Sequence, residues 1–325
     1  MSQTRLWITV VALAGMAIAA AAVPAGAQPY PNRPIKLIVP FPAGGPADVM
    51  GRLIAQQLSA NLGQVIVENR PGAGSTLGAK SVAAAEPDGY TLLLGSSASL
   101  AIGPALYSSA GYDPLKSFVP IGLVSDVPYV MVGAVAAPFR TVAEFIAAAR
   151  ASPGKLNFGV PNGAPPHMLA LLFRHLTRAD VTVVPYRGAA TVITDLIGGQ
   201  IDAGFETTSV MLAHLHEGKV RGLAVITPNR LPQLPDVPTM RESGVPDLVG
   251  SSWIGLLAPA GTPPEVVRKV RAALVEGLKS PEIGEKFAKL GATARPLTQD
   301  EFAEFIASEA HRLGAIIRLS GAKGE

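Results

Sequence analysis

Short apolar segments alternate with segments of helical periodicity along most of this chain, and this alternation most constrains its fold. Residues 35–39 are a run of β-favouring residues, and across 46–62 the apolar residues then recur on one helical face. Strand–helix alternation over this length predicts an α/β fold with mostly parallel sheets, in which ligands bind at the carboxyl ends of strands. Further strands are predicted at 65–67, 90–94, 129–132, 156–158, 181–184, 202–205, 223–226 and 253–257.

The first 27 residues have the pattern of a secretory signal. Arg5 precedes an uncharged apolar run, and the small residues Ala25 and Ala27 mark a cleavage site before Gln28. The alternative is a single membrane anchor, because a run of about 17 residues is at the lower limit for spanning a bilayer. A cleaved signal at 1–27 predicts a soluble protein that is exported to the periplasm.

Composition and missing motifs exclude several classes of function. The chain has no cysteine, so it forms no disulfide, thiolate metal site or cysteine nucleophile. Its net charge of +3 comes without a long run of Lys and Arg, which argues against a nucleic-acid partner. The sequence motifs of P-loop proteins, zinc proteases and serine hydrolases do not occur. We therefore expect no cofactor and no metal.

The loop after the first predicted strand carries the strongest chemical signal. Gly44 and Gly45 allow a ligand to approach the backbone closely, and Pro46 suits the first position of a helix. The free N–H groups of such a helix start, together with the helix dipole, favour an anion. The alternative is an ordinary strand-to-helix turn with Asp48 as an acid in the first helical turn.

Two later strand-to-helix loops offer similar chemistry. The segment 157–167 contains a Gly/Asn/Pro turn and places His167 in the first turn of the next helix, where a capping or surface role is the alternative. The segment 95–99 brings three serines to the end of a strand, where their hydroxyls can donate to an anion. Clustered serines after a strand are also common in plain loops.

Helix-start signals and apolar stripes complete the sequence pattern. Thr141, Thr262 and Thr298 each precede a Glu by three residues, so each predicts a capping box. The C-terminal helices carry apolar stripes, and we expect them to pack on the first domain. The chain then crosses between two domains twice, near 126–130 and 249–253.

Seven motifs resemble those of the periplasmic solute-binding proteins of tripartite tricarboxylate transporters, also called Bug-type receptors. They are YPNRPI at 30–35, VPFPAGGPAD at 39–48, VENRPGAG at 67–74, PDGYTLL at 87–93, VPYRG at 184–188, LPDVPT at 234–239 and APAGTP at 258–263. The resemblance implies a two-domain periplasmic-binding-protein fold of the Venus flytrap, type II-like kind, with a ligand cleft between the domains. We expect domain 1 at 28–127 plus 251–325, and domain 2 at 128–250.

The resemblance also implies a binding site without catalytic or metal-binding residues. In that family the loops that match 41–48 and 160–167 grip one ligand carboxylate, partly through water. Ala47 and Ala164 stand where family members often have Ser or Thr, so backbone N–H groups and water are expected to do more of the work. The ligand-binding residues expected by this match are Phe41, Ala43, Gly44, Gly45, Ala47, Asp48, Ser96, Ser97, Asn162, Gly163, Ala164, His167, Glu206 and Thr207.

Asp48 is the unexpected member of this set, because its carboxylate repels a bound carboxylate. Three roles stay open for it. It can orient the loop by accepting backbone N–H groups, fix a bridging water, or hold a ligand ammonium group.

These observations predict a non-enzymatic binding protein. We expect it to capture a small organic anion, either a di- or tricarboxylate, an aromatic acid or an amino acid, and to deliver it to the membrane subunits of a tripartite tricarboxylate transporter. A hinged receptor of this kind works as a monomer. An orphan receptor of the same fold that signals through a membrane sensor is the first alternative, and an exported α/β hydrolase is a remote one.

Overall fold

The computed structural model describes residues 30–162 and 164–320, so the predicted secretory signal lies outside the described residues. The described residues from Arg33 to Ser320 form one compact unit. In the described ranges no helix combines the length and the apolar character that crossing a membrane requires.

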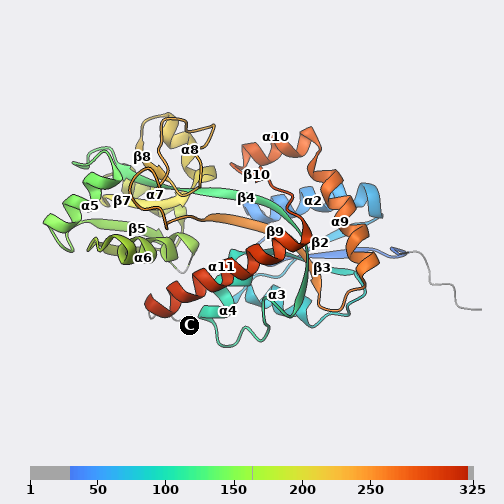
Figure 1. Cartoon of the computed structure of the whole chain (residues 1–325). Helices are drawn as coiled ribbons and strands as arrows, with labels where there is room; N and C mark the ends of the chain where they lie inside the picture. The colour runs from blue at the N-terminus through green and yellow to red at the C-terminus, as the bar shows by residue number, and fades with distance from the viewer. Residues whose placement is uncertain (1–29, 163, 321–325) are drawn as a thin grey trace, which may run out of the picture. The chain divides into compact units, whose positions relative to one another are not determined.

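The first group of strands is parallel and comes from two consecutive strand–helix units (Figure 1). Strand β1 pairs with β2 on one side and with β3 on the other. The elements are β1 (Ile35–Val39), α2 (Pro46–Leu62), β2 (Val65–Asn69), η1 (Ala73–Ser75), α3 (Thr76–Ala83), β3 (Thr91–Ser96), η2 (Ala98–Ile102) and α4 (Gly103–Leu106). The predicted strand at 35–39 and the predicted helix at 46–62 are confirmed to the residue.

A second parallel group repeats this pattern later in the chain. Strand β5 lies between β6 and β7 and is parallel to both. The elements are α5 (Val142–Ala151), β5 (Asn157–Pro161), α6 (Pro165–Thr177), β6 (Thr182–Tyr186), α7 (Ala189–Ile197), β7 (Ala203–Thr207) and α8 (Thr208–His216).

Antiparallel strands join the two groups, and they correct the prediction of mostly parallel sheets. The strand order is β2-β1-β3-β9-β4-β7-β5-β6, with β8 (Val220–Val225) and β10 (Thr293–Ala294) also paired to β4 (Phe118–Ala134). Among the described strands four pairings are parallel and five are antiparallel. The reason is topological: β4 carries the chain out to the second group and β9 (Ser251–Pro259) carries it back, so these two strands run in opposite directions (Figure 1).

Strand β4 is much longer than the predicted strand at 129–132. It covers 17 residues, and its first half pairs with β9 despite Pro120, Ser125 and Pro128. The register shifts twice along this pairing, so no simple alternation marks it in the sequence. Local pattern therefore revealed only the most apolar part of the strand.

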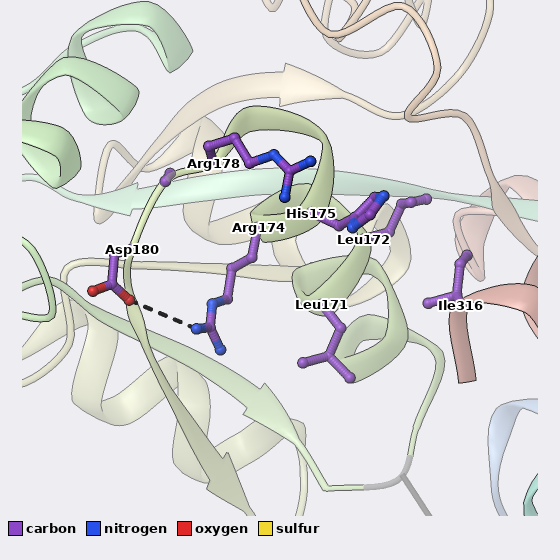
Figure 2. Close-up of a pocket in the computed structure, with 8 residues that line it drawn as sticks. Leu171, Leu172, Arg174, His175, Arg178, Asp180 and Ile316 are labelled. Atoms are coloured by element: carbon purple, nitrogen blue, oxygen red, sulfur yellow. Dashed lines mark ion pairs between the residues drawn. The ribbon is translucent and has the colours of Figure 1, made fainter. Parts of the chain in front are cut away.

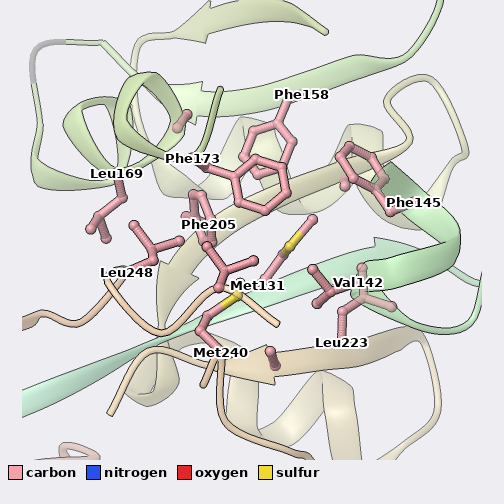
Figure 3. Close-up of a cluster of buried hydrophobic side chains, with 14 of the residues drawn as sticks. Met131, Val142, Phe145, Phe158, Leu169, Phe173, Phe205, Leu223, Met240 and Leu248 are labelled. Carbon is pink, nitrogen blue, oxygen red and sulfur yellow. The ribbon is translucent and has the colours of Figure 1, made fainter. Parts of the chain in front are cut away.

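The second group of strands has an aromatic core (Figure 3). The ring centroids of Phe158 and Phe205 lie 4.9 Å apart, and the rings of Phe145 and Phe173 lie within about 6 Å of Phe158. Met131 of β4 belongs to the same cluster, so the connecting strand is anchored in this core.

The C-terminal helices pack mainly beside the first group of strands. Helix α9 (Pro264–Leu278) contacts α2 and β4, and α10 (Pro281–Lys289) leads into β10. Helix α11 (Gln299–Ser320) contacts η2, α4 and β4, but it also reaches α6, where Leu313, Ile316 and Ile317 share an apolar cluster with Met168. The expectation that these helices pack on one domain therefore omitted the contact with α6.

Two of the three predicted capping boxes form hydrogen bonds at a helix start. The hydroxyls of Thr141 and Thr298 accept from the N–H of the Glu three residues later, at 3.2 Å in both cases. The prediction at Thr262 is wrong, because α9 begins at Pro264 and its N-cap is Pro263. The ring of Pro264 disfavours a helical conformation at Pro263, which moves the helix start one residue along the chain.

Candidate ligand-binding site

A cavity of about 310 Å³ lies at the carboxyl ends of strands from both groups. The loop after β1, the end of β3, the β5–α6 loop and the end of β7 each contribute residues, and the paired strands β4 and β9 close one side. This is the position where α/β folds bind ligands. The lining residues are Phe41, Ala47, Met50, Ser96, Ser97, Ala98, Val127, Tyr129, Pro161, Ala164, Pro165, Pro166, Glu206, Thr207, Ser209, Val210, Ser252, Ile254 and Leu290.

Half of the predicted ligand-binding residues line this cavity: Phe41, Ala47, Ser96, Ser97, Ala164, Glu206 and Thr207. The structure therefore brings together four segments that are far apart in the sequence. Ala43, Gly44, Gly45, Asp48, Asn162 and His167 lie in the same loops or first helical turns but do not line the cavity. Gly163 lies outside the described residues.

Several lining residues were not predicted from the sequence. Ser252 of β9 pairs with Val127 of β4, and Tyr129 of β4 pairs with Thr207 of β7. Both residues lie where the chain was expected to cross between domains, so the crossing itself was a usable signal. Leu290 follows α10 and has no local signal, because only the tertiary fold brings the C-terminal region to the strand ends.

Asp48 anchors the loop at the start of α2. Its Oδ2 accepts the N–H of Gly44 at 2.8 Å and Nε of Arg52 at 3.0 Å, and its Oδ1 accepts Nδ2 of Asn69 at 2.9 Å. Gly44 has φ +83°, a conformation that favours glycine. Burial raises the pKa of Asp48, but the hydrogen bonds from Arg52, Gly44 and Asn69 outweigh it and bring the pKa to about 2. These contacts match the first of its three open roles, which is to orient the loop.

The two helix starts at the cavity differ in their backbone donors. In α2 only the first position is proline, so the N–H groups of Ala47 and Asp48 stand in the first turn, where a helix has no internal partner for them. Helix α6 begins with Pro165 and Pro166, which have no N–H.

The remaining described donors of the α6 start are engaged within the chain. The N–H of Asn162 donates to Tyr186, that of Ala164 to Pro161 at 3.3 Å, and that of His167 to Ala164 at 2.9 Å. The sequence predicted an anion site from the helix start but did not account for the donors that two prolines remove. Burial also lowers the pKa of His167, which favours its neutral form.

The serines after β3 hold one another in a tight turn. The N–H of Ser96 donates to Oγ of Ser99 at 3.0 Å, and the N–H of Ser99 donates to Oγ of Ser96 at 3.4 Å. Tyr112 donates its hydroxyl to the carbonyl of Ser99. Ser97, which lines the cavity beside this turn, is therefore presented by a locally rigid segment.

Glu206 is the only acidic residue among the described lining residues, and these include no Lys, Arg or His. It ends the apolar part of β7 and is 4% exposed. Burial raises the pKa of its carboxyl to about 6, although the N–H of Thr207 donates to Oε2 at 3.0 Å and partly opposes this rise. At a pH above this value, the formal charge on the described lining side chains is therefore negative.

A second cavity, of about 390 Å³, lies beside the carboxyl-terminal part of α6 (Figure 2). Arg174, His175 and Arg178 line it together with Leu171 and Ile316, and Arg174 pairs with Asp180 at 3.6 Å. It contains none of the predicted ligand-binding residues and lies away from the strand ends. Its larger volume does not make it the candidate site.

The fold and the position of the first cavity define a mixed α/β protein of the periplasmic-binding-protein class, as predicted. The family model for "Tripartite tricarboxylate transporter family receptor" matches residues 50–322. The chain belongs to this family, which consists of solute-binding receptors and not of enzymes.

Individual relatives agree with this assignment. BugT of Bordetella pertussis is 40% identical over 328 residues, which cover 99% of this chain and 99% of the relative. The structure of R. palustris Rpa4515 with adipate is 32% identical, has a TM-score of 0.76, and covers 90% of this chain and 99% of its own. MatC from Rhodopseudomonas palustris with bound malate is 33% identical, has a TM-score of 0.74, and covers 89% of this chain and 100% of its own.

Proposed function

We propose that this protein captures a small carboxylate-type metabolite in the cavity at the strand ends and delivers it to the membrane subunits of a tripartite tricarboxylate transporter. One observation carries the proposal: a single cavity collects the ends of β1, β3, β5 and β7 beside the crossing strands β4 and β9. Membership of the receptor family supports the transporter as partner. The related structures with adipate and with malate support a carboxylate as ligand.

The proposal includes two domains that move about the crossing strands. Domain 1 comprises residues 28–127 and 251–325, and domain 2 comprises residues 128–250. Support comes from the register of β4 and β9, which pairs Asp126 with Trp253 and Pro128 with Ser251 at these boundaries. Two adjacent paired strands form a hinge that lets the lobes close while their ends stay joined.

We further propose that residues 1–27 are removed during export and that the mature receptor acts in the periplasm as a monomer. The apolar run after Arg5 and the small residues before Gln28 support cleavage there. Mass spectrometry of the protein from a periplasmic extract is expected to find an N-terminus at Gln28. A chain that keeps its first 27 residues and stays with the membrane would contradict this part of the proposal.

Ligand binding can be tested on refolded, ligand-free protein. We expect at least one member of a panel of di- and tricarboxylates, aromatic acids and amino acids to raise the melting temperature. A ligand at one hundred times its Kd stabilises the folded state by about 2.7 kcal/mol. Native mass spectrometry of the protein before refolding is expected to show a co-purified molecule of the same class. No stabilisation by any member would contradict the proposed function.

A matched pair of variants tests whether the cavity is the site. Ala47 lines the cavity, whereas Val49, two residues later in α2, is 39% exposed and does not line it. Ala47→Phe is expected to weaken binding of every stabilising ligand at least tenfold because the larger side chain fills the cavity. Val49→Phe is the control and is expected to leave the Kd unchanged. Equal binding by both variants would place the site elsewhere.

A further inference from the structure

We propose that Glu206 selects the ligand: the cavity takes a small carboxylate that also carries a protonated amine, as an α-amino acid does, and the amine pairs with the Glu206 carboxylate. This inference rests on the proposed function, because it names the ligand class of the same cavity. Plain dicarboxylates of equal length are then poor ligands.

The position of Glu206 carries the inference. The residue lines the cavity from the end of β7 and is almost fully buried. Among the described residues its hydrogen-bond donors are the N–H of Thr207, which reaches Oε2, and the Thr207 hydroxyl, and neither carries a charge. Every other described lining side chain is apolar or carries a hydroxyl. A buried carboxylate without a cationic partner is unfavourable. A cationic group on the ligand therefore increases its affinity for this cavity, whereas an anionic group near Glu206 decreases it.

The described groups of β4, α8 and α11 that lie near Glu206 do not supply that cation. In the β4–β7 ladder, Val130 lies opposite Glu206 and Tyr129 lies opposite Thr207. Burial raises the pKa of Tyr129, and the negative charge of Glu206 contributes to this rise, so the phenol stays neutral. On α11, the charges of Glu309 and Arg312 also affect the pKa of Tyr129, but these two side chains form an ion pair with each other at 2.7 Å. On α8, the hydroxyl of Ser209, which lines the cavity, forms a hydrogen bond with that of Thr207 at 2.9 Å.

Asp48 does not compete for the amine. Both of its oxygens accept hydrogen bonds from the protein, one of its partners is already the guanidinium of Arg52, and it does not line the cavity. The role of holding a ligand ammonium group, which the sequence left open for Asp48, therefore passes to Glu206. For the carboxylate end of the ligand, Ser97 and the first turn of α2 offer hydroxyl and N–H donors elsewhere in the cavity lining.

The pH dependence of binding follows from this pairing. The pKa of Glu206 is about 6 in the empty cavity, so the residue is mostly ionised at pH 7.5. A bound ammonium lowers this pKa, and affinity for an amino acid falls as the pH drops below 6. A second ligand carboxylate raises the same pKa, so a dicarboxylate binds with uptake of a proton and more tightly at acidic pH.

The test uses ligand pairs that differ in the amine. Refolded mature protein is titrated calorimetrically at pH 7.5 with leucine against 4-methylpentanoate, aspartate against succinate, and glutamate against glutarate. In at least one pair the amino member is expected to bind at least tenfold tighter than its partner. The variant Glu206→Gln is expected to lose at least tenfold in affinity for that amino acid and to keep or improve affinity for the partner. The control Glu217→Gln changes an exposed acid at the end of α8 and is expected to change neither Kd.

The outcomes separate this inference from the proposed function. Amine-free carboxylates that bind as tightly as the amino acids, without proton uptake, would overturn the role of Glu206 and leave the receptor function standing. Failure of both members of every pair to bind would also overturn the role of Glu206. The wider panel of di- and tricarboxylates, aromatic acids and amino acids then decides the receptor function separately. If Glu206→Gln does not fold, the wild-type protein still decides the matter, because its affinity for amino acids must fall between pH 7.5 and pH 5.

Discussion

The two acids nearest the cavity, Asp48 at the start of α2 and Glu206 at the end of β7, resemble each other in burial but differ in their partners. Asp48 is 3% exposed and Glu206 is 4% exposed. Asp48 accepts three hydrogen bonds, one of them from a guanidinium, and its pKa falls to about 2. Glu206 lines the cavity, has uncharged donors from Thr207 and no cationic partner among the described residues, and its pKa rises to about 6. Burial alone therefore does not tell a structural acid from one that is available to a ligand; the hydrogen-bond partners do.

The largest expected effect on stability comes from removing the carboxylate of Asp48. Asp48→Ala leaves the Gly44 loop without its anchor, and we expect it to lower the free energy of unfolding by about 2–3 kcal/mol, at roughly 1 kcal/mol for each lost hydrogen bond. Urea denaturation followed by circular dichroism measures this.

A second variant at the same position, Asp48→Asn, tests the role of Asp48 in ligand choice. If Asp48 only positions the loop, Asp48→Asn weakens amino acids and amine-free carboxylates by the same factor. A much larger loss for amino acids alone would show that Asp48, and not Glu206, meets the amine.

A somewhat smaller effect on the free energy of unfolding is expected from the ionisation of Glu206 in the absence of ligand. The pKa of Glu206 is raised from 4.5 to about 6, so the folded state binds its proton more tightly than the unfolded state. Its contribution to stability is therefore greatest below pH 4.5 and is lost as the pH rises through 6, by about 2 kcal/mol. Subtracting the pH profile of Glu206→Gln from that of the wild type should isolate this decline; parallel profiles between pH 4.5 and 7 would contradict it.

Asp48 is expected to show the opposite sign in a lower pH window. Its pKa is depressed from 3.8 to about 2, so its contribution is present above pH 3.8 and is lost as the pH falls through 2. The effect is about 1–2 kcal/mol, because Arg52 is 55% exposed and solvent screens the pair. Acid titration of the unfolding free energy, compared with that of Asp48→Asn, measures it. Equal acid sensitivity of both proteins would show that the contacts of Asp48 do not depend on its charge.

The smallest expected effect concerns the proline at the second position of α6. Pro166→Ala returns an N–H to the second position of α6 beside the cavity, and we expect a few-fold gain in affinity for the ligand carboxylate, or about 0.3–1 kcal/mol. Calorimetric titration measures the Kd. Pro264→Ala makes the same change in the first turn of α9, whose residues do not line the cavity, and is expected to leave the Kd unchanged. A gain in both variants would mean that the effect does not come from the restored donor.

Individual helices and strands could be predicted from the sequence where no neighbouring proline and no irregular strand pairing opposed the local residue pattern. Helix 46–62 has a clear apolar face, a proline at its start and Gly63 after its end, and its bounds agree with the structure. The capping signal at Thr262 failed because Pro264 imposes an extended conformation on the residue before it. Strand β4 was mostly missed because its pairing with β9 is irregular and overrides local polarity.

In the candidate site, too, local features could be predicted from the sequence, whereas contributions from distant segments could not. The glycine and proline loops after β1 and β5 and the polar ends of β3 and β7 could be named in advance, because such residues at strand ends are a local feature. Tyr129, Ser252 and Leu290 could not, since they reach the cavity only through the crossing strands and the return of the C-terminal region. The contrast between Asp48 and Glu206 was also invisible, since it depends on partners such as Asn69 that are distant in sequence.

The sequence by itself determined the order of strands and helices, the chemical character of the loops that follow the strands, and the resemblance to a receptor family, because each of these depends on residues close together in the chain. Only the tertiary structure decided which strands run antiparallel, which loops share a cavity, and which of two buried acids has a cationic partner among the described residues. Those properties depend on pairings between segments far apart in the chain, such as Leu93 of β3 with Leu257 of β9. The low dielectric of a buried site also makes the presence or absence of a single partner decisive.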